Sequence, residues 1–159
     1  MSDPQTMAER SAAAMWAADA ASQSLGMTLD EIRPGYARMS MRVRGDMVNG
    51  HAICHGGLVF ALADSAFAFA CNSYNRTTVA QACDIVFVAP ARLDDVLVAQ
   101  AVERTRFGRN GIYDVTVTTV PAGDSDGAAF TEEGRGELVA EFRGRSRQIA
   151  GTLAEESQP

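Results

Sequence analysis

The helix expected at residues 57–72 constrains the fold more than any other segment, because it is apolar on every side. Its circumference is covered by several alanines and by larger apolar residues, namely Leu58, Val59, Phe60, Leu62, Phe67 and Phe69. A helix on the surface of a sheet keeps a polar face toward water, and this one has none. It therefore has to be enclosed. A single antiparallel sheet of about five or six strands, curled around one central helix in an α+β arrangement, would enclose it.

Five segments have the patterns of strands that could form this sheet. Residues 36–43 alternate apolar and polar side chains with a period of two, which is typical of a half-buried strand. Four further apolar, β-branched runs lie at 77–88, 96–104, 111–120 and 137–149. The turn residues at 108–111 predict a tight hairpin, and the composition of residues 121–134 predicts a longer, acidic hairpin loop. Strands joined in this way are antiparallel.

The remaining segments predict a single domain with helical and polar ends. A chain of 159 residues, 47% of them hydrophobic, is long enough for one compact core and short for two. An Ala-rich helix is expected at about 4–24, with Gly26 as its stop. The core then runs over about 26–150, and the polar tail 151–159 is expected to be flexible.

Charge and cysteine content exclude several classes of partner. A formal net charge of −6 disfavours a nucleic-acid binder, which uses Lys and Arg to displace counterions. The three cysteines have neither disulfide-framework nor Cys-x-x-Cys spacing, so we expect a reduced, cytoplasmic compartment. No signal core or bilayer-length apolar run is present, so we expect no membrane partner.

A lone carboxylate, Asp64, interrupts the apolar helix. Burying an unpaired carboxylate is costly unless its pKa rises, so this residue needs an explanation. Two structural explanations are that Asp64 caps a second helix beginning at Ser65, or that it bonds a neighbouring loop. The third is that Asp64 is a functional carboxylate.

The glycines at the start of this helix supply a chemical partner for the carboxylate. Free N–H groups of Gly56 and Gly57 at a helix N-terminus bind oxyanions or polarised carbonyls. A carbonyl polariser and a carboxylate are the minimal parts for acyl transfer. Gly56 and Asp64 are 8 residues apart, which is about 12 Å of helix. A second chain must therefore close the site, with the two central helices antiparallel across a twofold axis.

Residues 49–73, NGHAICHGGLVFALADSAFAFACNS, closely resemble the signature of hotdog-fold acyl-CoA thioesterases of the phenylacetate-degradation (PaaI-type) family. That signature is Asn-Gly, then His-Gly-Gly, then Asp within the central helix. The likeness continues through GIYDVTV and FRGRSRQIAGT and covers about residues 19–152. It implies a hotdog fold, hydrolysis of an acyl-CoA thioester, and a homodimer that assembles into a homotetramer. No cofactor is needed, because CoA belongs to the substrate.

The resemblance also implies roles for single residues. By position, Asp64 matches the catalytic carboxylate, Gly56 the backbone donor to the thioester carbonyl, and Asn49 and His55 the polar residues beside it. Asp64 acts either as a general base or as a nucleophile, and the sequence does not choose between them. The chain departs from the pattern in two places: the loop 121–134 is longer than usual, and Ala80 stands where animal-type relatives carry a catalytic hydroxyl.

Substrate binding is assigned to the backbone of Gly57 and to arginines. Arg143, Arg145 and Arg147 alternate on one face of the last strand, where they would suit the phosphates of CoA. An exposed sheet edge defended by charge explains the same pattern equally well. Arg109, in the tight turn, has the same two explanations.

Other site chemistries are weaker. His51 and His55 have a spacing that could ligate a metal, but no third ligand is near, so no metal is expected. Cys54 beside His55 could suggest a thiol nucleophile, yet sequence neighbours on a loop usually point apart.

We predict a thioesterase that acts on phenylacetyl-CoA or hydroxyphenylacetyl-CoA. Phe60, Phe67 and Tyr74 would line an aromatic pocket, or else belong to the core. Two alternatives use the same fold: an enoyl-CoA hydratase, and a non-catalytic acyl-CoA-binding sensor. The hydratase is disfavoured because the histidine precedes the glycines and lies well away from Asp64 along the chain. The sensor is disfavoured because the catalytic Asp and the glycines of the signature are all present.

Overall fold

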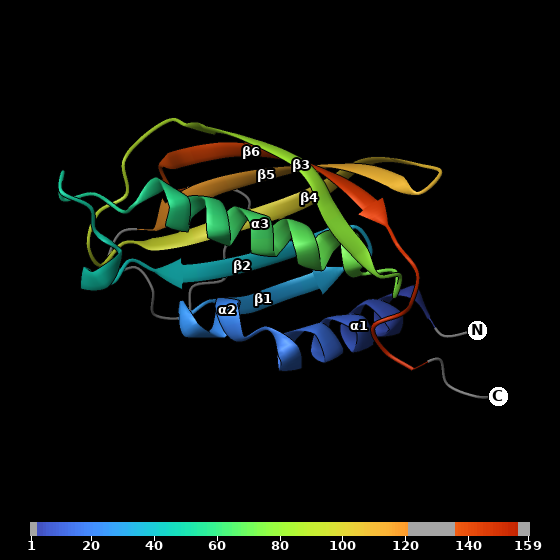
Figure 1. The fold of residues 1–159 in the computed structure, drawn as a ribbon. Helices are drawn as coiled ribbons and strands as arrows, with labels where there is room; N and C mark the ends of the chain where they lie inside the picture. The colour runs from blue at the N-terminus through green and yellow to red at the C-terminus, as the bar shows by residue number, and fades with distance from the viewer. Residues whose placement is uncertain (1–2, 121–135, 156–159) are drawn as a thin grey trace.

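A computed structural model describes residues 3–120 and 136–155 of the chain, and a single six-stranded antiparallel sheet dominates it. The elements in order are α1 (Pro4–Ala18), α2 (Ala20–Ser24), β1 (Thr28–Arg33), β2 (Tyr36–Arg42), the short 3₁₀ helix η1 (Gly45–Met47), α3 (Gly56–Asn72), β3 (Thr78–Phe87), β4 (Val96–Phe107), β5 (Asn110–Val120) and β6 (Leu138–Gln148). The strand order is β1-β2-β4-β5-β6-β3. Figure 1 shows the sheet curved around α3, with α1 and α2 beside β1.

The enclosed central helix predicted from the sequence is α3. Its side chains form the middle of the core, where the Phe67 ring lies 5.5 Å from the Tyr113 ring and 5.9 Å from the Phe142 ring, centroid to centroid. Gly144 on β6 lets the sheet approach closely, because a Cβ there would lie 2.7 Å from the Phe67 ring. An α+β arrangement with a sheet wrapped around one helix is therefore confirmed.

The N-terminal helix predicted at about 4–24 is divided into two. Asp19 breaks it, with φ −87° and ψ 75°, and then caps α2 by accepting a 2.9 Å hydrogen bond from the Ser22 N–H. The Ser22 hydroxyl donates to the same carboxylate at 2.7 Å and contacts the Ser65 hydroxyl at 2.9 Å. The Asp side chain thus competes with the helix backbone and attaches α2 to α3.

Strand β1 was not among the five predicted strands. Its sequence, TLDEIR, carries three charged residues and shows no apolar alternation, yet it pairs with β2 over its whole length. Pairing to a neighbouring strand, which local pattern does not report, decides the structure here. The other strands and α3 agree with their predicted positions to within a few residues at each end.

Residues 151–155 make contacts that the sequence did not predict. We expected a flexible tail over 151–159, but residues 151–155 are held by hydrogen bonds to Asn75, Thr77 and Arg10. Residues 156–159, like the predicted hairpin loop 121–134, lie outside the described residues. The tight hairpin at 108–111 is present, with Gly108 at φ 56° as the turn requires.

Two features of the surface bear on partners. Strand β3 is an edge of the sheet and pairs with β6. Four exposed apolar residues lie on β3 or directly after it, namely Val79, Val86, Phe87 and Val88. In the described ranges, no helix has the length and hydropathy needed to cross a bilayer.

The tight contact between β6 and α3 generates a stability prediction. Gly144→Ala should lower the free energy of unfolding by about 1–3 kcal/mol, because the new methyl group overpacks against the Phe67 ring. Urea denaturation followed by circular dichroism measures it. Gly45→Ala is the matched control, since no heavy atom lies within 4 Å of a Cβ at Gly45. Equal stability of Gly144→Ala and wild type would contradict the enclosed packing.

Candidate active site

The start of α3 is shaped by His55, which caps the helix. His55 has φ −59° and ψ 129°, and its Nδ1 accepts a 2.9 Å hydrogen bond from the Gly57 N–H. Accepting through Nδ1 requires that this nitrogen carry no proton. The His55 side chain is exposed, while its own N–H donates to the Met47 carbonyl at 2.8 Å. His55 therefore joins the preceding loop to the helix.

The cap engages one of the two glycine amides in a hydrogen bond and leaves the other without one. The Gly57 N–H is bonded to His55, whereas the Gly56 N–H has no acceptor among the described residues. Gly56 also allows a close packing contact, because a Cβ there would lie 3.0 Å from the Phe87 ring at the end of β3. One free donor, at the positive end of the helix dipole, is available to a ligand.

Asn49 organises the loop in front of this helix. Its Oδ1 accepts from the His51 N–H at 2.9 Å, and its backbone N–H donates to the Ile53 carbonyl at 2.8 Å. Ala52 has a left-handed backbone, φ 59°, between these contacts. Asn49 thus fixes a tight loop, and through it the position of His55.

Asp64 lies in the middle of α3, partly exposed. The helix is continuous from Gly56 to Asn72, so the explanation that Asp64 caps a second helix at Ser65 is wrong. No hydrogen bond or ion pair joins Asp64 to another group within 3–120 and 136–155, which removes support for the loop-bonding explanation. Burial raises the pKa of the Asp64 carboxyl. A partly buried carboxylate without a partner among the described residues remains, as expected of a functional group.

The thiols near this region are poor nucleophiles at neutral pH. Burial raises the pKa of Cys54 to about 11. Burial, with the Asp64 charge as a smaller contribution, raises the pKa of Cys71 to about 12 and that of Cys83 to about 11. Because the thiolate is the reactive form, these values disfavour a cysteine mechanism. The part of the chain that the structure describes contains no cluster of three or more His, Cys, Asp or Glu residues suited to a metal.

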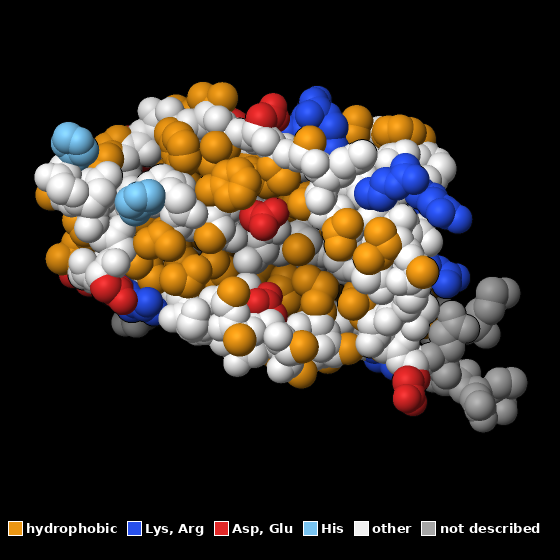
Figure 2. Space-filling model, in the orientation of Figure 1, with side chains coloured by type: hydrophobic (Ala, Val, Ile, Leu, Met, Phe, Trp, Pro, Cys, Tyr) orange, Lys and Arg blue, Asp and Glu red, His pale blue; other side chains and the backbone are white. Residues whose placement is uncertain are grey.

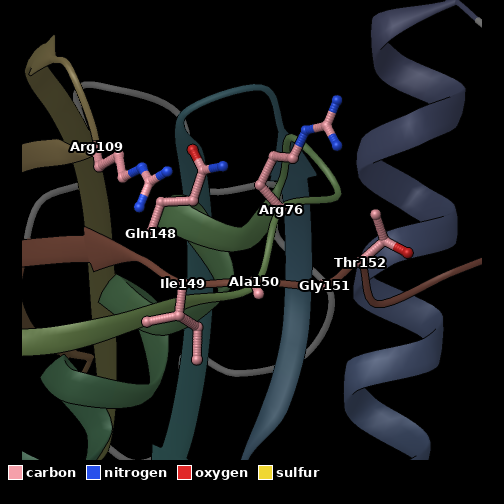
Figure 3. A pocket seen from close by; sticks show the side chains of 7 residues that line it. All are labelled: Arg76, Arg109, Gln148, Ile149, Ala150, Gly151 and Thr152. Atoms are coloured by element: carbon pink, nitrogen blue, oxygen red, sulfur yellow. The ribbon is translucent and has the colours of Figure 1, made fainter.

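Arg109 lines a separate pocket at the far end of the sheet. The pocket has a volume of about 350 Å³ and is lined by Arg76, Arg109, Gln148, Ile149, Ala150, Gly151 and Thr152. Figure 3 shows Arg109 and Arg76 on either side of Gln148, with Ile149 pointing the other way. The Arg109 carbonyl accepts a 2.7 Å bond from the Gln148 N–H, which fixes the turn against the end of β6. Two always-charged guanidinium groups make this pocket suitable for phosphate.

The other predicted arginines are not in this pocket. Arg143 binds Asp114 through two hydrogen bonds, of 2.6 and 2.9 Å, and Arg104 binds the same carboxylate at 2.8 Å. These bonds hold the pKa of Asp114 below its usual range, with Arg143 the larger contribution. Arg145, also exposed, is in register with Ala82 and Ile112. Arg143 is thus already engaged in an ion pair on the face of the sheet that points away from α3.

The three aromatic residues proposed for an acyl pocket have different surroundings. Phe67 is fully buried in the core, and Phe60 packs edge-on against Phe142 at 5.3 Å between centroids. The Tyr74 hydroxyl donates to Glu103 at 3.0 Å, and the Arg106 guanidinium lies 3.7 Å from the centre of the Tyr74 ring. Phe67 is therefore a core residue, and Tyr74 belongs to a polar network.

Sequence reasoning missed Arg76 and Gln148 in the pocket with Arg109. No local pattern marks them, because they meet only through the register that pairs β6 with β3 and β5. Figure 2 shows the face of the molecule on which α3 lies: both His side chains are at one end and basic side chains gather at the other. The helix start and the basic pocket are thus separate parts of the molecule.

Comparison with known proteins identifies the family. The profile of the Thioesterase superfamily matches residues 51–121. The acyl-coenzyme A thioesterase PaaI of Escherichia coli K12 is 37% identical over 148 residues, 93% of this chain and 96% of that protein. The structure of E. coli PaaI, from the phenylacetic acid degradation operon, superposes with a TM-score of 0.83 over 94% of this chain and 99% of that one.

A solved variant of the phenylacetic acid degradation protein PaaI from Thermus thermophilus is 31% identical and superposes with a TM-score of 0.69, covering 80% of this chain and 97% of that one. These likenesses confirm the hotdog fold and the thioesterase expected from residues 49–73. The chain belongs to the Thioesterase superfamily, as a member of the PaaI family of thioester hydrolases.

Proposed function

We propose that this chain hydrolyses aryl-acyl-CoA thioesters, such as phenylacetyl-CoA or hydroxyphenylacetyl-CoA, to the free acid and CoA. One observation carries the proposal: among the described residues, an apolar helix holds a partly buried carboxylate without a partner, Asp64, and begins with a free amide, Gly56. The E. coli relative is an acyl-coenzyme A thioesterase, and its structure is described as coming from the phenylacetic acid degradation operon, which supports an aryl substrate.

In the proposed reaction the Gly56 N–H donates to the thioester carbonyl, and the helix dipole stabilises the negative charge that develops on that oxygen. Asp64 then either removes a proton from water, which attacks the carbonyl, or attacks directly and is released by water from the resulting anhydride. Both routes break the C–S bond, give the sulfur a proton, and consume one water. No cofactor takes part, because CoA enters and leaves as substrate and product.

The neighbouring polar residues have supporting roles in this proposal. The Gly57 amide is engaged by His55, so Gly57 serves by allowing close approach of substrate rather than as a second donor. His55 caps the helix through the Gly57 amide and leaves the Gly56 amide free, and Asn49 fixes the loop that carries His55. Raising the pKa of Asp64 by burial makes its carboxylate a stronger base.

We propose that two chains share each site. Gly56 and Asp64 lie about 12 Å apart along their own helix, too far to act on one carbonyl. A second copy can pair with the free edge of β3, where Val79, Val86, Phe87 and Val88 are exposed. Such pairing would cover apolar surface and bring two α3 helices together across a twofold axis. Two dimers would then form the proposed homotetramer.

For the CoA moiety we propose the pocket of Arg109, with Arg76, as the phosphate site. Arg145 remains a second candidate, whereas Arg143 would first have to leave Asp114. The three free cysteines support the proposal that the enzyme works in the reducing cytoplasm.

The proposal predicts a pattern of thiol release. Phenylacetyl-CoA and hydroxyphenylacetyl-CoA should be hydrolysed with a higher kcat/KM than octanoyl-CoA, in an assay that detects free CoA thiol. Crotonyl-CoA should not be hydrated in a parallel assay. Octanoyl-CoA as the better substrate would refute the aryl assignment and leave the reaction class intact. Hydration without thiol release would indicate a hydratase, and binding without either reaction would indicate a sensor.

Asp64→Asn should lower kcat roughly 10²-fold to 10⁴-fold while KM changes little, because the amide keeps the shape but loses the basic oxygen. Stopped assays of thiol release with hydroxyphenylacetyl-CoA measure this. An activity within threefold of wild type would remove Asp64 from the mechanism.

The stability of the same variant serves as its control. Because burial raises the pKa of Asp64, its ionisation destabilises the folded state, so the contribution of Asp64 to the free energy of unfolding falls as pH rises above about 4. Asn does not ionise. The free energy of unfolding of Asp64→Asn should therefore equal or exceed that of wild type at pH 7, and the difference between the two proteins should shrink toward pH 4. A marked loss of stability at pH 7 would mean that Asp64 holds the fold.

A further inference from the structure

The basic pocket has one wall made of the chain that follows β6. Gly151 and Thr152 line it opposite Arg109, and both lie beyond the end of the sheet. A segment outside a strand needs other contacts to stay in one place. The Gly151 carbonyl accepts a 3.0 Å bond from the Thr77 N–H, which secures the near end of this wall.

The far end of the wall is held by the side chain of Asn75. The Asn75 Oδ1 accepts from the Leu153 N–H at 3.0 Å and from the Ala154 N–H at 2.8 Å. The Asn75 Nδ2 donates to the Ala154 carbonyl at 3.0 Å. Both lone pairs of the oxygen are thus used, so the amide side chain binds the tail as a neighbouring strand would.

The position of Asn75 suits this role. Only 3% of its surface is exposed, and it lies between α3 and β3, directly before the pocket residue Arg76. Its backbone is left-handed, with φ 55°, a conformation that Asn and Gly adopt more readily than other residues. Glycine at this position could adopt the same backbone conformation, but Asn also bonds residues 153 and 154 through its side chain.

We infer that Asn75 is a positioning residue for the nucleotide end of CoA: it holds residues 151–154 as a wall of the pocket that carries Arg76 and Arg109. The inference rests on the proposed function, in that it takes a CoA thioester as the substrate. A wall that is ordered before binding does not have to be ordered by the ligand, so the affinity for CoA is higher. Asn75 follows the C-terminal end of α3, whereas Gly56, the proposed donor to the carbonyl, begins that helix, so we expect the chemical step to be unchanged.

Asn75→Gly tests this, because glycine keeps the left-handed backbone and removes the three tail contacts. KM for phenylacetyl-CoA and Kd for CoA, by calorimetry, should each rise roughly tenfold. Values of kcat, and of kcat/KM for the phenylacetyl thioester of pantetheine, which lacks the nucleotide and its phosphates, should stay within twofold. Amide exchange of the peptide containing Leu153 and Ala154 should become faster.

A matched control is Asp94→Gly. Asp94 is also left-handed, with φ 69°, but its side chain is 63% exposed and faces Arg42 at 3.9 Å on the surface. This variant makes the same kind of change in backbone freedom away from the tail. Its Kd for CoA and its KM should match those of wild type.

Three results would overturn the inference. An unchanged Kd for CoA with faster exchange of the tail would mean that the wall does not contribute to binding. Equal losses with phenylacetyl-CoA and the pantetheine thioester would mean that Asn75 supports the fold or the catalytic step. Unchanged exchange would mean that Asn75 does not hold the tail. If wild type binds CoA but releases no thiol, the proposed function fails, and the CoA binding of Asn75→Gly still decides this inference.

Discussion

Desolvation of α3 is the constraint on which the rest of the structure depends. A helix that is apolar on all sides cannot lie against water, so the sheet curves around it and uses Gly144 to approach Phe67. The same packing partly buries Asp64 and gives it no hydrogen-bond or ion-pair partner among the described residues. One physical cause therefore produces both the fold and the raised pKa of the Asp64 carboxyl.

At the start of the helix, the two glycine amides differ in their hydrogen bonding, and the proposed site depends on that difference. His55 accepts from the Gly57 N–H, which stabilises the helix start, and leaves the Gly56 N–H free. A cap that engaged both amides would stabilise the helix further, but it would leave no N–H donor for a substrate carbonyl. Because α3 is straight and continuous, the free amide and Asp64 remain a fixed distance apart, and this rigidity makes a second chain part of the proposed chemistry.

Local sequence patterns predict the elements whose apolar side chains are buried. The elements and the pocket that depend on strand register cannot be predicted in this way. The enclosed α3, five of the strands and the tight turn at 108–111 follow from apolar periodicity and turn residues. Strand β1 has no such pattern and forms through pairing with β2, and the pocket of Arg76 and Arg109 depends on how β6 meets its neighbours. The contacts of residues 151–155 were missed for a related reason, because they come from residues distant in the sequence, such as Asn75, which lies 78 and 79 residues from Leu153 and Ala154. The roles of Asp64 and Gly56 stay predictions.

Mixing two inactive variants tests the central claim, that Gly56 and Asp64 act from different chains. Asp64→Asn removes the carboxylate. Gly56→Pro removes the free amide hydrogen at the first helical position, which proline commonly occupies. The preceding His55, at ψ 129°, already has a suitable backbone, and the exposed Phe87 ring, which lies 3.0 Å from a Cβ at this position, has to shift slightly. Each homodimer lacks half of both sites, whereas a heterodimer has one complete site. With a shared site, we expect about half of the wild-type activity per heterodimer, with heterodimers counted by native mass spectrometry. Inactive heterodimers whose chains are both folded by circular dichroism would contradict it.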